Sequence, residues 1–398
     1  MAIPSAGLAR VLPASTAGWV FAAWWIAAVL ASAARAAEGP PPELKIAFIG
    51  DQGLSPSAEA VLELIRDEGA DAVVHAGDFD YQGDPAAWDA QIDAILGADS
   101  PYFASSGNHD KGAFLGPGGY QERLEARLDR LRIPWEGDLG IQSSLRYQGI
   151  RIVLTTPDEF GAGDGFHDLY IRDRLAEDAS IWRISAWHRN MRLMQVGGKG
   201  DDTGWGVYEE SRRGGAIVAT AHEHSYSRTH LLARCETQSV ASTSDTLVLA
   251  GDDSGTPADE GRSFVFVSGL GGRSIRSQQL DGPWWASVYT STQGANHGAL
   301  FGVFHHQGDP RLARFYFKDV DGVVADEFLV ESTLGNDPQC SNGIDDDGDG
   351  RIDFPSDAQC RSAADDRESF TLRSCGLGFE IVLVPALVAL RLRRRWKR

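Results

Sequence analysis

The feature that most constrains the fold is a repeated pattern in which an apolar stretch ends in glycine and polar residues before a segment of helical spacing begins. Between residues 44 and 131 the apolar stretches are LKIAFIG, DAVVHAG and PYFASSG. The helical segments are SAEAVLELIRDEG, PAAWDAQIDAILG and GYQERLEARLDRL. Alternating strands and amphipathic helices are typical of an α/β domain, in which ligand-binding groups gather at the carboxyl ends of the strands.

From about residue 144 the pattern becomes richer in β-strands. SSLRYQGIRIVLTT predicts a hairpin, and IWRISAWH and GAIVATAHEH predict further strands. FVFVSGLGG, GALFGVFHH and ARFYFKDVDGVVADEF predict antiparallel strands that close the domain. The polar stretches 195–205 and 235–262 are expected to be surface loops, and such loops often border a binding site.

The composition is that of an acidic globular protein. The chain has 398 residues, of which 42% are hydrophobic and 23% charged, and its formal net charge is −19. This length is enough for one large domain or two ordinary ones. The negative charge argues against a nucleic-acid-binding groove.

Residues 1–37 predict a secretory signal peptide, with an apolar stretch ahead of the small-residue cleavage site ARA at 34–36. A membrane anchor is the alternative, although the apolar run is short for a bilayer span. Residues 38–43 are a proline-rich linker. The protein is therefore expected to be exported, to a bacterial cell envelope or the extracellular space.

Residues 374–398 contain a second short apolar segment, which follows a cysteine and precedes a terminal basic cluster. They resemble bacterial C-terminal sorting tails, which implies envelope sorting machinery as a partner. A frayed amphipathic end is the alternative.

The four cysteines predict one disulfide. Cys340 and Cys360 flank one compact acidic loop, and export permits disulfides, so these two are expected to pair. Cys375 belongs to the tail, which leaves Cys235 unpaired and buried.

The segment 336–368 contains CSNGIDDDGDGRIDFPSDAQC, with aspartates at alternate positions followed by a turn glycine. This spacing suits a hard cation such as Ca²⁺. Ser356 stands where a bidentate acid is expected, and a merely solvated acidic loop is the alternative. The expected Ca²⁺ site comprises Asp345, Asp347, Asp349, Arg351 and Asp353.

Five polar motifs follow the predicted strands. They are GDQG (50–53), GDFDY (77–81), GNHD (107–110), WHRN (187–190) and AHEH (221–224). Together they offer the donor types that two metal ions about 3.5–4 Å apart require. Each motif alone has a structural explanation, as a turn residue or a hydrogen-bonded histidine, but five of them at strand ends favour a binuclear metal site.

This ordered set resembles the calcineurin-like metallophosphoesterase superfamily and, within it, the purple acid phosphatases. Many superfamily members carry a histidine where this chain has Gly53, whereas the purple acid phosphatases have a tyrosine at the position of Tyr81. The resemblance implies an α/β fold with a two-sheet β-sandwich flanked by helices. The catalytic domain would span residues 44–333, with the calcium loop as a small C-terminal extension.

The resemblance also implies a division of ligands between two ions. Three anionic oxygen ligands favour a hard trivalent ion, Fe(III), at the first position, while the second suits divalent Fe, Zn or Mn. The first ion would be held by Asp51, Asp78, Tyr81 and His224, and the second by the shared Asp78 with Asn108, His188 and His222.

The implied reaction is hydrolysis of a small phosphate ester, preferably a monoester, by a metal-bound hydroxide that attacks in line. His109 is the candidate for stabilising the phosphoryl charge or protonating the leaving alcohol. Asp110 either orients His109 or caps a helix. His230 and His297 are candidates for lining the substrate pocket.

Two alternative functions stay open. A phosphodiesterase or nucleotide hydrolase could use the same metals, because the long loops decide which substrates fit. A calcium-stabilised surface module that binds without hydrolysis belongs to another class, and the complete set of metal-ligand residues speaks against it.

Overall fold

The computed structural model describes residues 40–157, 160, 166–252, 259–335, 339–341, 350–360 and 363. The predicted signal peptide and C-terminal tail lie outside these residues, as do Asp345, Asp347 and Asp349 of the expected calcium site. Arg351 and Asp353 are described, but the calcium site stays a prediction. In the described part of the chain, no helix is both long and apolar enough to cross a membrane.

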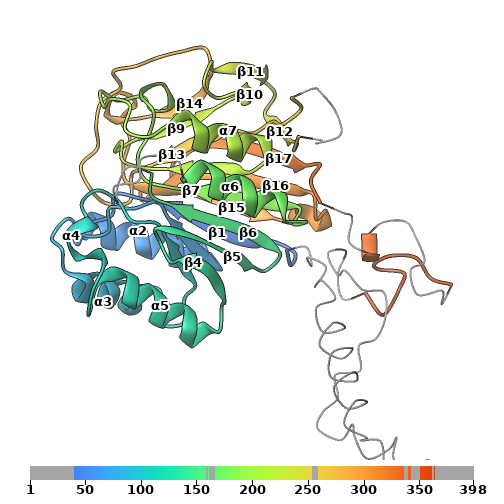
Figure 1. The fold of residues 1–398 in the computed structure, drawn as a ribbon, viewed down its shortest axis with the longest axis horizontal. Coiled ribbons are helices and arrows are strands. Elements are labelled where there is room, and N and C mark those ends of the chain that lie inside the picture. The colour runs from blue at the N-terminus through green and yellow to red at the C-terminus, as the bar shows by residue number, and fades with distance from the viewer. Residues whose placement is uncertain are drawn as a thin grey trace, which may run out of the picture.

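Two large β-sheets form the centre of the molecule (Figure 1). The first sheet contains β1 (Leu44–Ile49), β2 (Ala72–His75), β3 (Tyr102–Ala104), β12 (Thr246–Leu249), β15 (Gly298–Phe304), β16 (Leu312–Asp319) and β17 (Val324–Ser332). Its order is β12-β17-β16-β15-β1-β2-β3. β1, β2 and β3 run parallel, whereas β15, β16 and β17 form an antiparallel meander.

The second sheet has eight strands. They are β4 (Trp135–Asp138), β5 (Gln142–Tyr147), β6 (Ile150–Thr155), β7 (Trp182–Ala186), β8 (Ile217–Thr220), β9 (Tyr226–Thr229), β13 (Val265–Ser268) and β14 (Trp285–Tyr289). Their order is β14-β9-β13-β8-β7-β6-β5-β4, and β6, β7 and β8 are parallel. A separate ribbon pairs β10 (Leu231–Arg234) with β11 (Ser239–Ser242).

Helices flank both sheets (Figure 1). Beside β1, β2 and β3 lie α2 (Pro56–Asp67), α3 (Pro85–Ile95), the short α4 (Lys111–Phe114) and α5 (Tyr120–Leu131). α6 (His167–Ala176) and α7 (Trp205–Arg213) pack together and cover the second sheet. Local side chains define where α2 and α3 begin. The side chains of Ser55 and Asp84 accept backbone N–H bonds at these two helix starts, and a proline follows each residue.

Aromatic side chains hold the two sheets together. Each sheet contributes one ring to every pair, and edge-to-face or stacked rings add to the free energy gained by burying apolar surface. The ring-centroid distances are 5.3 Å for Phe48–Phe266, 5.1 Å for Trp182–Phe304, 4.3 Å for Tyr226–Phe317 and 5.1 Å for Phe103–Tyr147. The predicted two-sheet sandwich flanked by helices is confirmed.

Two strand predictions need correction. β13, expected to be purely antiparallel, pairs parallel with β8 and antiparallel with β9. The stretch 235–262, expected to be a surface loop, contains β11 and β12, and β12 extends the first sheet beside β17. Leu247 and Leu249 are fully buried there, so apolar burial overrides the polar composition around them.

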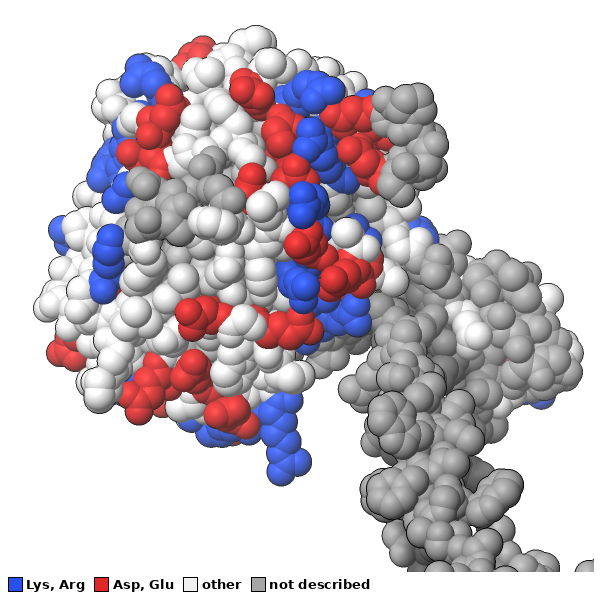
Figure 2. All heavy atoms as spheres, viewed as in Figure 1, with Lys and Arg blue, Asp and Glu red and all other residues white. Residues whose placement is uncertain are grey.

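The cysteine predictions are confirmed. Cys340 and Cys360 form a disulfide, and Cys235 is a buried free thiol. On the face shown in Figure 2, basic and acidic side chains are interspersed instead of forming one basic surface.

We expect Phe48→Ala to lower the free energy of unfolding, measured with urea, by about 3–5 kcal/mol, because it removes a buried ring between the sheets. Phe48 is 1% exposed and contacts both Phe266 and Phe315. Val324→Ala is the control, since Val324 is 46% exposed, and it should stay within about 0.5 kcal/mol of the parent. Equal losses in both variants would contradict a sheet-to-sheet core centred on these rings.

Candidate metal centre

The five polar motifs meet at one place because parallel strands end at the same sheet edge. β1, β2 and β3 are neighbours in the first sheet, and β7 and β8 are neighbours in the second. Each of these strands stops just before its motif. The residues brought to this edge are Asp51, Asp78, Tyr81 and Asn108 from the first sheet and His188, His222 and His224 from the second.

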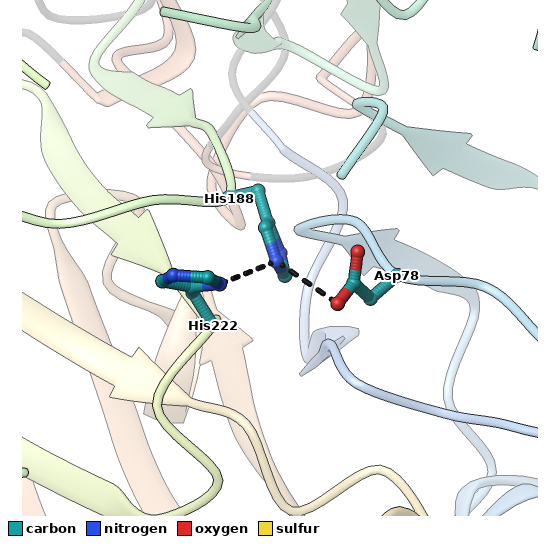
Figure 3. A group of neighbouring side chains, drawn as sticks. All are labelled: Asp78, His188 and His222. Atoms are coloured by element: carbon teal, nitrogen blue, oxygen red, sulfur yellow. Dashed lines mark hydrogen bonds and ion pairs between the residues drawn. The ribbon is translucent and has the colours of Figure 1, made fainter. Parts of the chain in front are cut away.

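One group of donors comprises Asp78, His188 and His222, which point toward one another (Figure 3). His188 Nε2 lies 3.2 Å from Asp78 Oδ2 and 3.0 Å from His222 Nδ1. One ligand atom from each residue falls within 4.8 Å of the other two, and all three residues are buried. Carboxylate oxygen and imidazole nitrogen at this spacing can hold a divalent ion.

A second group comprises Asp51, Tyr81 and His224. The Tyr81 hydroxyl donates to Asp51 Oδ1 at 2.7 Å and lies 3.2 Å from His224 Nε2. His224 Nε2 is 3.4 Å from Asp51 Oδ1. Two oxygen donors and one nitrogen donor therefore converge beside the first group.

Unsatisfied oxygens support metal binding at both groups. Asp51 Oδ2 and Asn108 Oδ1 are buried and accept no hydrogen bond. Leaving such acceptors unpaired is costly, and a cation is one partner that would satisfy them. The loop that carries Asn108 adjoins the first donor group, because the His109 N–H donates to Asp78 Oδ1 at 2.9 Å. The residues present thus fit two ions.

Each imidazole of the two groups is oriented by a contact on the side of the ring that faces away from the other donors. One ring nitrogen faces the donors, while the other contacts an oxygen outside the centre, as in many metal sites. The outer contacts are His188 Nδ1 with the Ala76 carbonyl at 2.7 Å, His224 Nδ1 with Ser274 Oγ at 3.0 Å, and His222 Nε2 with Asp202 Oδ2 at 3.4 Å.

The backbone is strained at four of the candidate ligands. Asp51, Asp78, Tyr81 and His222 have φ angles of +56°, +62°, +61° and +68°. Non-glycine residues seldom adopt this left-handed region, and such outliers cluster at functional sites. Four of the seven candidate ligands therefore carry backbone strain, although positive φ angles also occur at described residues away from the centre, such as Arg132 and Gln238.

Electrostatics couple the two carboxylates to the histidines. Burial alone would lower the pKa of His188, but the Asp78 and Asp51 carboxylates outweigh it and raise this pKa to about 9. Burial and the neighbouring His188 lower the pKa of His222, which keeps that ring neutral. Burial, Asp51 and Asp78 raise the pKa of Tyr81, so its phenol is protonated without a metal.

The sequence profile of the calcineurin-like phosphoesterase family matches residues 44–226. This segment, which carries all the candidate ligands, belongs to the calcineurin-like phosphoesterase family. No curated protein sequence matches the chain.

Solved structures match the chain at low identity, and the one with a TM-score above 0.5 shows the fold. A purple acid phosphatase from yellow lupin (Lupinus luteus) seeds has a TM-score of 0.54 and 18% identity, with 74% of this chain and 55% of that chain covered. The chain thus spans about half of the lupin protein. PhoD has a TM-score of 0.48 and 12% identity, with 75% and 71% covered. GAP50 of Plasmodium has a TM-score of 0.46 and 10% identity, with 74% and 90% covered.

Asp110 connects two loops of the candidate metal centre. Its carboxylate is fully buried and accepts the backbone N–H groups of Asp78, Phe79 and Gly107 at 2.7–2.8 Å. It precedes α4 without a side-chain cap bond to that helix. Asp110 thus ties the Asp78 loop to the Gly107 loop instead of capping α4, and its orienting role toward His109 stays a prediction.

The other predicted histidines occupy different places. His109 is exposed, and its ring lies 4.7 Å from that of Tyr81, at the rim of the centre. His297 Nε2 donates to the carbonyl oxygen of Arg273, which is a wall residue of the cavity described below. His230 follows β9, so a four-residue strand separates it from the centre near His224, and its N–H bonds the Trp284 carbonyl.

Sequence reasoning missed several charged residues around His222. Lys199 Nζ donates to the His222 carbonyl, and burial lowers its pKa to about 8. Arg276 also reaches that carbonyl, at 3.4 Å, and pairs with Glu223 at 3.2 Å. Lys199 and Asp202 lie within the polar stretch 195–205, so the only sequence signal was that such loops often border a site.

We expect Asp202→Asn to weaken binding of the second metal ion by roughly ten- to hundredfold, because the carboxylate behind His222 orients the ring and increases its basicity. Competition with a chelator measures this affinity. Asp201→Asn is the matched control, since Asp201 accepts the Arg192 N–H instead. Equal metal affinities in the two variants would show that Asp202 does not support His222.

Proposed function

We propose that the protein is an exported, metal-dependent phosphoesterase that hydrolyses small phosphate monoesters. The observation that carries this proposal is the convergence of two donor groups from two sheets in a calcineurin-like phosphoesterase domain. Asp51, Tyr81 and His224 would hold Fe(III), with Asp78 shared between the ions. His188, His222 and Asn108 would complete a site for divalent Fe, Zn or Mn.

When bound, the ions would lower the pKa of a water molecule and draw charge from the phosphoryl oxygens. The protein's own groups do the rest. His109, at the exposed rim beside Tyr81, is placed to donate a proton to a leaving oxygen. Asp110 keeps the loop after β2 and the loop after β3 in register through its three backbone bonds.

Positive charge near the centre supports the monoester preference. A phosphate monoester carries nearly two negative charges at neutral pH, and a diester carries one. Lys199 bonds the backbone of His222, and the Arg273 guanidinium lies 4.5 Å from the Tyr81 ring. These cations favour the more highly charged ester.

The disulfide supports the export proposal. Cys340–Cys360 bonds of this kind persist in oxidising compartments outside the cytosol. Cleavage after the predicted signal at 1–37, the catalytic boundaries 44–333 and recognition of the tail 374–398 by sorting machinery belong to the same proposal.

The spectrum of the iron-loaded protein tests the first metal position. We expect a visible tyrosinate-to-Fe(III) absorption band that Tyr81→Phe abolishes, because that phenol is the expected oxygen ligand. Tyr147→Phe is the control and should keep the band, since Tyr147 bonds the Asp71 carbonyl on another part of the surface. A colourless, active zinc or manganese enzyme would retain the phosphoesterase and refute the Fe(III) assignment.

Turnover of aryl esters tests the reaction. Metal-loaded protein should cleave a monoaryl phosphate faster than a bis-aryl phosphate, and Asp78→Asn should lower kcat/KM by at least about 10²-fold, as expected when charge stabilisation in the transition state is lost. Cleavage of the bis-aryl ester alone would indicate a diesterase. No cleavage with two metals bound would indicate a binding module.

A further inference from the structure

A cavity of about 330 Å³ opens beside the metal centre. Tyr81 belongs to both, because it lines the cavity while its hydroxyl bonds Asp51. The other walls come from the loop around Gly53 and Ser55 and from the loop that carries Arg273. This volume is near the small end of the range for ligand pockets, so it suits the organic part of a small substrate.

Among the described residues that line the cavity, one side chain offers a positive charge to a ligand. Asp80 and Arg273 are the charged residues among the described lining. The Asp80 carboxylate is occupied, because it accepts the N–H groups of Gln82, Gly83 and Asp84 at 2.8 Å. In the described part of the chain, the Arg273 guanidinium has no acidic partner and contacts the Tyr81 ring. A guanidinium has five donors suited to a carboxylate or a phosphate.

Backbone bonds fix Arg273 relative to the metal centre. Its N–H donates to the Asp51 carbonyl at 2.9 Å, and its own carbonyl accepts from His297 Nε2. The next residue, Ser274, bonds His224 Nδ1 at 3.0 Å. The loop is thus attached to two candidate ligands of the first ion, and the Arg273 guanidinium lies over the ring of a third, Tyr81, at 4.5 Å.

Gly53 leaves the opposite wall open. A Cβ atom built on this residue would meet no atom within 4 Å, so a side chain there would enter free space. Its φ of +86° also favours glycine. The missing side chain therefore provides part of the space into which a leaving group can extend.

We propose that this cavity binds the leaving-group part of the substrate and that Arg273 selects phosphate esters whose alcohol carries a second anionic group, either carboxylate or phosphate. The inference rests on the proposed phosphoesterase function and names its substrate class.

Three esters test the selection in the metal-loaded enzyme: phenyl phosphate, a phenyl phosphate with a ring carboxylate, and a phenylene bisphosphate. The parent should favour one or both anionic esters over phenyl phosphate in kcat/KM, and Arg273→Gln should reduce that preference by roughly ten- to hundredfold, as expected for a charge-assisted bond. Arg273→Lys should restore part of it. Comparing the carboxylate ester with the bisphosphate shows which of the two anionic groups Arg273 prefers.

Arg314→Gln is the matched control, because Arg314 of β16 pairs with Glu327 of β17 and does not line the cavity, so it should leave the preference unchanged. The proposal is overturned if the parent does not prefer either anionic ester, or if Arg273→Gln lowers all three kcat/KM values by one factor. Calorimetry measures how tightly the same three esters bind, without turnover. If the anionic esters bind more tightly than phenyl phosphate but are not hydrolysed, the result counts against the proposed reaction and not against the selection by Arg273.

A second variant tests the cavity itself. Gly53→Asn places a side chain in the open space and should raise KM for the ring-bearing esters several-fold more than for a methyl phosphate. Gly69→Asn is the control, since Gly69 also has a positive φ and open space around its Cβ position but follows α2. Equal effects of Gly53→Asn on large and small esters would place the leaving group elsewhere.

Discussion

The contact between Asp78 and His188 joins the two sheets at the point where the chemistry is expected. Asp78 follows β2 in the first sheet and His188 follows β7 in the second, and their side chains lie 3.2 Å apart in the interior. The sheets can approach this closely because Gly77 has no side chain, since a Cβ atom there would lie 2.9 Å from His188 Cβ. Gly107 is required in the same way, as its Cβ would lie 2.3 Å from Asp78 Oδ1.

This approach gathers charge where burial makes charge expensive. Asp51, Asp78 and Asp110 lie together in the interior, and burial of unpaired carboxylates is strongly unfavourable. The chain offsets part of that cost in two ways, by the proton on His188 and by backbone N–H groups on Asp110. The remaining unpaired acceptors are what a cation would satisfy. Left-handed backbone at four ligand positions adds strain that the surrounding core must outweigh.

The aromatic core explains how such a centre is tolerated. Ring pairs bury apolar surface between the two sheets along the strands that lead to the centre, and α2, α3, α5, α6 and α7 cover the outer faces. The loops that carry Lys199, Arg273 and Arg276 then fold back over the strand ends and bond the backbone or the ring of candidate ligands. The loop contacts that support the candidate ligands thus also carry the residues of the proposed substrate recognition.

The sequence by itself determined the α/β class, the helices α2, α3 and α5 and the strands β1, β2 and β3, because the hydrophobic period is a local signal. The candidate donor residues followed from strand-end motifs and a family resemblance, and they stay predictions. The Cys340–Cys360 bond also followed from local spacing. Only the tertiary structure decided that β12 joins the first sheet, that Asp110 binds three backbone amides, and that Asp202 and Arg273 face the centre. These contacts join segments far apart in the chain. Packing selects their partners, and the hydrophobic period of one segment does not show which distant segment it will contact.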